Sequence, residues 1–326
     1  MMRSEADATK SRGAAMLDLE DLRVEQGDFT LSLGSFQILP GARMGIVGRN
    51  GCGKTTLLET LVGLREPAAM RGRLFGAELP SAVSQPDLRR RMGCQLQSTR
   101  FSRHVAVAEL LDLHLALYGR GNDRLMSALR LDELKGLRGG LLSRGQRQRL
   151  ELYMALAHGP EIVMLDEPLT GLDRRFCDVL LRFIRDELPS ACAVIVVGHS
   201  EEELLLANEV AWLQDGVLLD RGSTAHLVAK HAGRVLLRLS FHRVEQLIQA
   251  DAALSVLAGV HCWQDIDALQ LTLCGDGAIV GQVMALCPPD DLRAWEQGHT
   301  GVIDLVRLGQ RRTDRPEIEG RLPCLV

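Results

Sequence analysis

The feature that most constrains this chain is the segment Gly48-Arg-Asn-Gly-Cys-Gly-Lys-Thr55, which follows an apolar stretch and precedes a helical pattern. It matches the spacing GxxxxGK[ST], in which the glycines let the backbone curl so that successive N–H groups point at phosphate oxygens. Residues 43–47 predict a strand, and Leu57 and Leu61 belong to a leucine pattern at helical spacing. This order predicts an α/β fold with a phosphate-binding loop, the alternative being a glycine-rich turn with a chance lysine.

The loop residues have distinct expected roles. Gly48, Gly51 and Gly53 supply the turn, Lys54 adds positive charge beside the β- and γ-phosphates, and the Thr55 hydroxyl is placed to hold Mg²⁺. The helix that begins near Lys54 directs the positive end of its dipole at the same anion. We therefore predict that the nucleotide is bound by Gly48, Asn50, Gly51, Cys52, Gly53, Lys54, Thr55 and Thr56.

Two adjacent acids form a second candidate site. Asp166 and Glu167 follow the apolar strand pattern at 162–165, and at the end of a strand both side chains can reach a cleft. Asp166 is expected to hold Mg²⁺ through water, and Glu167 to polarise an attacking water. Strands often end in acids, so this pair alone is a weak signal. Together with the phosphate loop it indicates a catalytic site.

Composition excludes several classes of protein. The 326 residues include 46% hydrophobic and 25% charged residues, which fits a soluble chain of about two domains. Lys and Arg number 38 against 42 Asp and Glu, and only 7 Phe, 3 Trp and 2 Tyr are present, so a nucleic-acid-binding surface is not expected. No apolar run reaches the ~18–20 residues of a membrane span. The eight cysteines form no CxxC pair, which favours reduced thiols in the cytosol.

The pattern along the chain predicts four parts. Residues 1–16 are polar and predict a flexible tail, and in residues 17–232 strand patterns alternate with helical ones, which favours a mostly parallel sheet covered by helices. A leucine-rich helical subdomain is inserted at about 98–158. Residues 233–311 predict a small α+β domain, with strands at 235–240, 260–264 and 269–273 and helices at 244–253, 278–286 and 302–308. The charged segment 312–326 predicts disorder.

Five further segments, in a fixed order, make residues 17–232 resemble the nucleotide-binding subunit of ATP-binding cassette (ABC) transporters. They are Gln97, the helical insertion, the signature-like Leu142-Ser-Arg-Gly-Gln146, the D-loop-like Gly171-Leu-Asp173, and His199 at the end of an apolar strand. The resemblance implies a P-loop NTPase core that hydrolyses ATP with Mg²⁺.

The resemblance also implies residue roles. Gln97 would contact Mg²⁺ together with Thr55 and Asp166, and His199 would sense the γ-phosphate beside the catalytic Glu167. The signature residues Ser143, Gly145 and Gln146 of one copy would close over the ATP held by a second copy, and Asp173 would link the two sites. Without the resemblance, Ser143 and Asp173 are ordinary helix N-caps.

Three residues depart from the family pattern. Gln26 stands where the family often has an aromatic residue that stacks on adenine, and Phe29 is a possible substitute. Arg144 replaces a glycine of the commonest signature, and exporter-type relatives often carry Lys or Arg there. Cys52 lies inside the phosphate loop, so we hypothesise that alkylation of its thiol blocks ATP binding.

The expected function is therefore the ATP-hydrolysing subunit of a membrane exporter. It would lie in the cytoplasm, peripherally on the inner face of the cell membrane, and act with permease subunits and a second, identical or similar, ATP-binding subunit. No direct nucleic-acid contact is expected. The alternatives are a soluble ABC-type ATPase acting on nucleic acid or ribosomes, and a nucleotide-binding module without useful catalysis.

Overall fold

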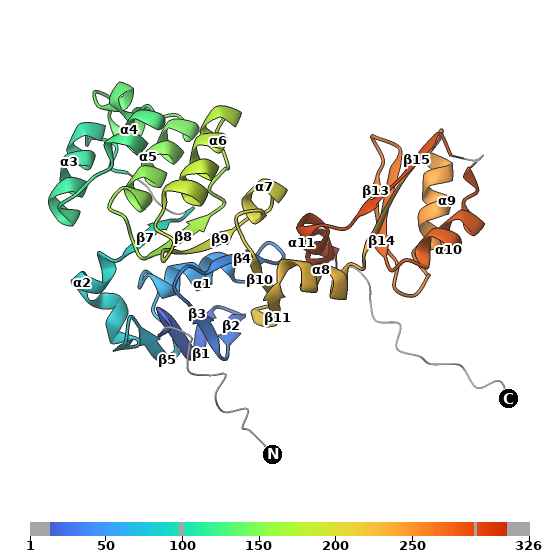
Figure 1. Ribbon diagram of the computed structural model, residues 1–326, viewed down its shortest axis with the longest axis horizontal. Coiled ribbons are helices and arrows are strands. Elements are labelled where there is room, and N and C mark those ends of the chain that lie inside the picture. The colour runs from blue at the N-terminus through green and yellow to red at the C-terminus, as the bar shows by residue number, and fades with distance from the viewer. Residues whose placement is uncertain (1–13, 98–100, 290–291, 312–326) are drawn as a thin grey trace, which may run out of the picture. The chain divides into compact units, whose positions relative to one another are not determined.

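The computed structural model of the chain describes residues 14–97, 101–289 and 292–311 (Figure 1). The predicted disordered tail 312–326, and all but the last residues of the predicted tail 1–16, lie outside the described residues. The chain divides into two compact units. The first runs to Val47 and continues over Gly51–Ser223, and the second comprises Gly48–Asn50 and the chain from Thr224.

The first unit is built on one mixed sheet, with the strand order β6-β5-β1-β2-β11-β10-β4-β9-β8-β7 and β3 paired to β1. The strands are β1 (Leu17–Gln26), β2 (Phe29–Leu33), β3 (Phe36–Ile38), β4 (Arg43–Val47), β5 (Ala69–Leu74), β6 (Ala77–Glu78), β7 (Met92–Gln95), β8 (Ile162–Asp166), β9 (Ala193–Val197), β10 (Glu209–Gln214) and β11 (Val217–Ser223). Neighbouring strands from β10 through β4, β9 and β8 to β7 are parallel. Their carboxyl ends therefore share one edge, where α/β folds bind ligands.

Helices cover both faces of these parallel strands. The helices of the first unit are α1 (Lys54–Leu61), α2 (Pro86–Arg89), α3 (Val107–Tyr118), α4 (Asp123–Ala128), α5 (Arg144–Leu156), α6 (Arg174–Arg182) and α7 (Glu201–Leu204). Met164 and Ile195 belong to the core that contains α1, whereas Leu165 and Val196 belong to the core that contains α5 and α6. Side chains that alternate between two cores are the expected result of a strand buried on both faces. The predicted α/β class is confirmed.

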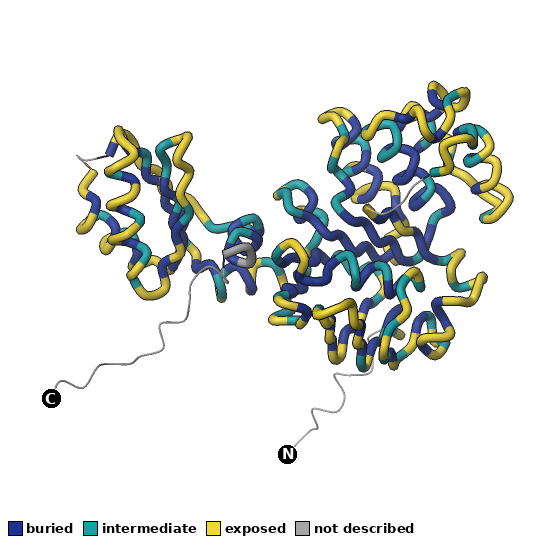
Figure 2. The backbone as a smooth tube through the Cα atoms, turned by 180° about the vertical axis from the view of Figure 1, so that it is seen from behind, coloured by how far each residue is buried: buried dark blue, intermediate teal, exposed yellow. Residues whose placement is uncertain are grey.

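Helices α3, α4 and α5 lie between β7 and β8, inside the range 98–158 for which a helical subdomain is predicted. Figure 1 shows α3, α4 and α5 gathered together in green, on one side of the parallel strands. Leu111, Leu125 and Leu150 pack in its core, and Figure 2 shows that its outer helices are largely exposed. Residues 98–100, where the insertion was predicted to begin, lie outside the described part of the chain.

The sheet is less parallel than the sequence predicts. Strands β3, β5 and β6 were not predicted, and β1 pairs antiparallel with β2, β3 and β5. The β5 segment carries two arginines and Gly72, so it lacks a clear apolar alternation. Gly72 adopts φ 139°, and an added Cβ would lie 2.1 Å from the Asp18 carbonyl oxygen. This strand is therefore determined by close packing against β1, and the pattern of its own residues does not predict it.

The second unit contains a four-stranded antiparallel sheet in the order β13-β14-β12-β15. Its elements are α8 (Thr224–His231), β12 (Val235–Ser240), α9 (Val244–Leu254), β13 (His261–Asp265), β14 (Gln270–Gly275), α10 (Ile279–Leu286), β15 (Ala294–His299) and α11 (Val302–Arg311). From β12 to β15 this is the β-α-β-β-α-β arrangement of ferredoxin-like folds. Leu237, Leu247 and Leu273 pack in its core.

Two features of the second unit differ from the sequence prediction. The units divide at Ser223, not at residue 232, because α8 packs against α11 within the second unit. Strand β15 was not predicted, since all six of its residues, Ala294–His299, are exposed and show no buried alternation. Its pairing with β12 defines it.

Candidate functional site

The phosphate loop connects β4 to α1 and has the backbone that its glycines allow. Gly51 and Gly53 adopt φ values of 79° and 105°, a region that favours glycine. A Cβ added to Gly53 would lie 3.0 Å from Phe29 Cζ and from Leu31 Cδ1. The loop is also anchored from the β10–β11 turn, where the Gly216 amide donates to the Cys52 carbonyl oxygen at 3.2 Å. Both side-chain space and backbone conformation therefore require glycine at position 53.

Lys54 is a buried cation at the start of α1, with 7% of its surface exposed. Burial lowers the pKa of its ammonium group, and electrostatic interaction with the nearby acidic groups of Cys52, Asp166 and Glu167 opposes that effect. A bound phosphate would add further negative charge beside Lys54, because an anion next to a desolvated ammonium stabilises its charged form. The geometry therefore suits an anionic ligand at the helix start.

Thr55 and Asp166 meet at the carboxyl edge of the sheet. The Thr55 hydroxyl donates to Asp166 Oδ2 at 2.8 Å, which joins the start of α1 to the end of β8. Asp166 is 1% exposed, and its Oδ1 is buried without a hydrogen-bond partner. Burial raises the pKa of this carboxyl, while the Thr55 hydrogen bond opposes the rise. A hydroxyl oxygen beside an unpartnered carboxylate oxygen fits Mg²⁺, which prefers hard oxygen ligands and retains bound waters.

Glu167 and His199 form a pair next to this position. His199 Nε2 lies 3.2 Å from Glu167 Oε1. Burial lowers the pKa of His199, assisted by the charge on Lys54, whereas Glu167 raises it; the net lowering favours a neutral imidazole near pH 7. Glu167 adopts φ 51°, an unusual conformation for a residue with a side chain and one often found at functional sites.

Glu203 was not predicted as a site residue, yet it holds two loops of the site together. Its Oε2 accepts the backbone amides of His199 at 3.0 Å and Ser200 at 3.2 Å, and its Oε1 accepts the amide of Leu169 at 3.1 Å. It is 3% exposed. The spacing Ser200-x-x-Glu203 is a capping-box signature and could have revealed this residue. Glu203 thus links the loop after β9 to the loop after β8.

A cleft of about 290 Å³ connects Asp166 and Glu167 to the helical subdomain. The residues that line it are Gln95, Gln97, Arg144, Arg147, Gln148, Glu151, Asp166, Glu167 and Thr170. The predicted Gln97 therefore faces the same space as Asp166 and Glu167. Gln95 and Glu151 were not predicted, because a lone glutamine on a strand and a lone acid on a helix carry no specific signal.

The signature-like segment begins α5. The Ser143 side chain accepts the Gln146 amide at 3.3 Å, and the Ser143 amide donates to Gln146 Oε1 at 2.9 Å. These bonds form a capping box. A Cβ added to Gly145 would lie 2.7 Å from the Gly171 carbonyl oxygen, so the start of α5 packs closely on the loop before Asp173.

Asp173 is the N-cap of α6 and accepts the Phe176 amide at 3.1 Å. Within one chain, Ser143 and Asp173 are therefore helix N-caps. Their roles toward a second copy stay predictions. Of the two candidates for adenine stacking, Gln26 is exposed, whereas the Phe29 ring lies against the phosphate loop at Gly53.

The comparisons with known proteins agree with this geometry. The family model described as ABC transporter matches residues 31–170. The lipopolysaccharide export system ATP-binding protein LptB of Acidithiobacillus ferridurans is 33% identical over 204 residues, which are 60% of this chain and 84% of that protein. The spermidine/putrescine import ATP-binding protein PotA of Mesorhizobium japonicum is 30% identical over 200 residues, and this chain covers 54% of it. Similar proteins thus serve both export and import.

Solved structures share the fold of the first unit. A structure of an ATP-binding subunit of an ABC transporter matches with a TM-score of 0.59 at 20% identity, covering 66% of this chain and 92% of that one. The dimeric structure of the ABC transporter cassette MJ0796 matches with a TM-score of 0.53 at 21% identity, covering 64% of this chain and 98% of that one.

Proposed function

This chain belongs to the ATP-binding subunits of ABC transporters, and we propose that its ATP hydrolysis powers a membrane exporter through separate permease subunits. As an ABC-type ATPase it binds ATP, with Mg²⁺ as the cofactor usual in this family. Export is supported by Arg144 in the signature-like segment, where exporter-type relatives often carry Lys or Arg. The chain would lie on the inner face of the cell membrane. In the described residues, no helix is long and apolar enough to cross a bilayer.

The observation that carries the proposed mechanism is the junction of Thr55, Asp166, Glu167 and His199 at one sheet edge. Bound Mg²⁺, held by Thr55 and Gln97 and through water by Asp166, would neutralise phosphate charge. Glu167 accepts a proton from the attacking water. Lys54 stabilises the negative charge that develops on the γ-phosphoryl oxygens. The neutral His199 donates a hydrogen bond that orients Glu167 or contacts the γ-phosphate once ATP is bound.

Two copies would complete two sites. Ser143 and the Gly145 amide stand at the start of α5, a helix of 13 residues, where amide donors and the helix dipole favour an anion. A head-to-tail pair places this helix start of one copy over the ATP bound by the other. ATP would close the pair and hydrolysis would open it, which moves the helical subdomain and the attached permease.

Replacing the catalytic base tests the chemistry. Glu167→Gln keeps the size of the side chain but removes the proton acceptor, so we expect phosphate release to fall by about 10²–10⁴-fold. ATP binding should persist, and ATP-bound dimers should accumulate because hydrolysis no longer separates them. Phosphate release and the mass of the complex with Mg²⁺ and ATP measure these two effects.

Glu161→Gln is the matched control, because Glu161 precedes the opposite end of β8 and pairs with Arg91 at the surface. Its turnover should stay within about twofold of the unmodified chain, as surface ion pairs contribute little. Near-normal hydrolysis by Glu167→Gln would refute the assigned role.

The export proposal has a separate test. Affinity purification of the full chain from detergent-solubilised membranes should recover proteins with membrane-spanning segments, and recovery should increase with Glu167→Gln and ATP. Turnover stimulated by RNA or DNA, without recovery of such proteins, would instead support the soluble alternative.

A further inference from the structure

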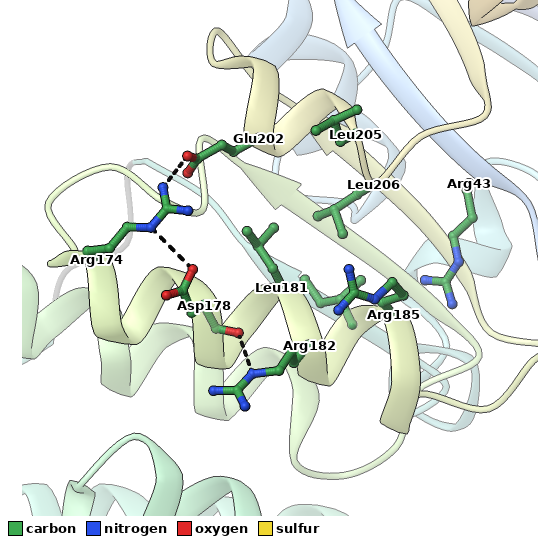
Figure 3. A pocket seen from close by; sticks show the side chains of 10 residues that line it. Arg43, Arg174, Asp178, Leu181, Arg182, Arg185, Glu202, Leu205 and Leu206 are labelled. Carbon is green, nitrogen blue, oxygen red and sulfur yellow. Dashed lines mark hydrogen bonds and ion pairs between the residues drawn. The ribbon is translucent and has the colours of Figure 1, made fainter.

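Helix α7 carries three consecutive glutamates, of which Glu203 is the one turned into the protein. Glu201 is exposed, and Glu202 pairs with Arg174 at the surface, as Figure 3 shows. Glu203 is 3% exposed, and among the described residues no cationic side chain forms an ion pair with it. A buried carboxylate without a cation is costly unless hydrogen bonds stabilise its charge. The hydrogen-bond partners of Glu203 therefore indicate why it is buried.

Three backbone amides converge on this carboxylate. Its Oε2 accepts the amides of His199 and Ser200, and its Oε1 accepts the amide of Leu169. A capping box needs only the bond from Ser200, whose hydroxyl in turn accepts the Glu203 amide at 3.3 Å. The bonds from His199 and Leu169 are additional, and Leu169 lies 34 residues away along the chain. Capping a helix of four residues does not account for them.

Both loops that Glu203 holds carry a residue of the proposed catalytic pair. Glu203 bonds directly to the amide of His199, and the amide of Leu169 is two residues beyond Glu167. The side chains of the pair meet at 3.2 Å, between His199 Nε2 and Glu167 Oε1. Beyond the last bond of the sheet, in which the Glu167 amide donates to the Val197 carbonyl oxygen at 2.8 Å, Glu203 bridges the two loops. The contact between His199 and Glu167 depends on the separation that this bridge sets.

Close packing limits the movement of the Glu203 side chain. A Cβ added to Gly198 would lie 2.7 Å from Glu203 Cβ and 3.0 Å from its Oε2. The loop after β9 therefore passes directly over this side chain. Groups that must stay in register at a site are held by side chains that packing and hydrogen bonds lock in place. Glu203 has both kinds of restraint.

We propose that Glu203 is a positioning residue for ATP hydrolysis, which fixes the separation of the loops after β8 and β9 and thereby the placement of His199 against Glu167. The inference rests on the proposed function, in which Glu167 accepts a proton from the attacking water. Misplacing a catalytic group by about 1 Å can cost up to about 10²-fold in rate. Loss of the bridge lowers the rate of hydrolysis, whereas ATP binding depends on the phosphate loop and persists.

Glu203→Gln tests this role, because glutamine has the size of glutamate but only one acceptor oxygen. Its NH₂ group would face the amide of either Leu169 or His199, so one of the two links must break. We expect kcat to fall at least about tenfold. The Kd for ATP and the amount of ATP bound per chain should change less than about twofold, since the interactions lost act on the transition state. Phosphate release and titration with a fluorescent ATP analogue measure these quantities.

Glu201→Gln is the matched control, because it makes the same substitution at an exposed residue of the same helix; its kcat should stay within about twofold of the unmodified chain. Gly198→Ala keeps the charge of Glu203 but displaces its carboxylate. This variant should also lose kcat with ATP binding retained, and it tests the inference even if Glu203→Gln does not fold.

A second readout reports on His199 without depending on activity. In the NMR spectrum of the full chain with isotope-labelled histidine rings, the His199 signal is the one that His199→Gln removes. Glu203→Gln should shift this signal, and Glu201→Gln should leave it in place. An unshifted His199 signal in Glu203→Gln would overturn the inference.

Glu167→Gln, measured in the same assays, separates this inference from the proposed function. Near-normal hydrolysis by Glu167→Gln would mean that the proposed function itself fails. If Glu167→Gln is inactive while Glu203→Gln and Gly198→Ala keep normal kcat, the positioning role alone is overturned. The same holds if these two variants lose kcat only in proportion to the ATP bound per chain, because Glu203 would then support the fold and not the placement of His199.

Discussion

At the scale of single residues, Glu151 is the clearest departure from what a soluble helix normally carries. It lies on α5, lines the catalytic cleft and is 8% exposed. Burial raises its pKa to about 7 from an ordinary value near 4.5, although the charge on Arg147 opposes this. Between those pH values the folded chain binds more protons than the unfolded chain, so this group makes stability fall as pH rises.

Glu151→Gln should therefore stabilise the first unit at high pH. The free energy of unfolding of the variant should exceed that of the unmodified chain by up to about 3 kcal/mol at pH 8, with the gain shrinking toward pH 4.5. Urea unfolding at pH 5 and pH 8 measures it. Glu78→Gln, at a residue whose side chain is 78% exposed, is the control. The same stability difference at both pH values would contradict the buried, protonated state.

Cys52 illustrates how the structure changes a hypothesis drawn from sequence. A thiol inside the phosphate loop suggested that alkylation blocks ATP binding, but Cys52 is only 3% exposed. Burial raises the pKa of its thiol, while Lys54 lowers it. Since the thiolate is the reactive form, N-ethylmaleimide at pH 7 should modify Cys52 at least about tenfold more slowly than it modifies glutathione.

Mass spectrometry of a time course checks this rate, and ATP binding should decline in step with Cys52 modification. Labelling as fast as that of glutathione would show that the phosphate loop opens readily in solution. The Cys52 thiol would then be accessible there and not buried.

At the scale of elements, the contact between the start of α5 and the loop after β8 joins the signature-like segment to Asp173. An added Cβ at Gly145 would approach the Gly171 carbonyl oxygen to 2.7 Å, so Gly145→Ala must displace one of the two segments. We expect ATP turnover to fall by roughly tenfold, since misplacing catalytic groups by about 1 Å can cost up to about 10²-fold. ATP binding to the phosphate loop should be retained.

Gly136→Ala provides the control within the same helical subdomain, because an added Cβ there meets no atom within 4 Å. Turnover and binding of a fluorescent ATP analogue, measured on both variants, separate the two effects. Equal turnover in the two variants would mean that the close contact is not needed for hydrolysis.

The sequence predicts well those strands whose own residues show a continuous apolar pattern. Strand β8 is an apolar run that ends at Asp166, and its bounds agree with the expected 162–165 to within one residue. Strand β9 is likewise a continuous apolar run, and it ends shortly before His199. Strands β5 and β15 were missed because pairing with β1 and β12 defines them. Likewise, the motif residues Thr55 and Asp166 meet as expected. Glu203 could be recognised only as the acid of a capping box, and Glu151 belongs to no motif, so their places in the site follow from tertiary packing.

At the scale of the whole molecule, the question is whether each ATP is held by two copies. Lys54→Ala should disable the phosphate loop of one copy, and Ser143→Arg should disable its signature-like helix start; each variant alone should be inactive. In a head-to-tail heterodimer of the two variants, one site combines both defects and the other combines two intact surfaces.

An equal mixture should therefore recover activity that neither variant has alone. With random pairing, half of the dimers are mixed and half of their sites are intact, so turnover should reach about a quarter of the unmodified level. The recovered activity is measured as phosphate release by the mixture, compared with the summed phosphate release of the two variants assayed separately. Mass measurement must first show that mixed dimers form. If they form and no activity is recovered, a site with an intact phosphate loop and an intact signature-like helix start is present without turnover. Residues 143–146 would then not complete the site of a second copy.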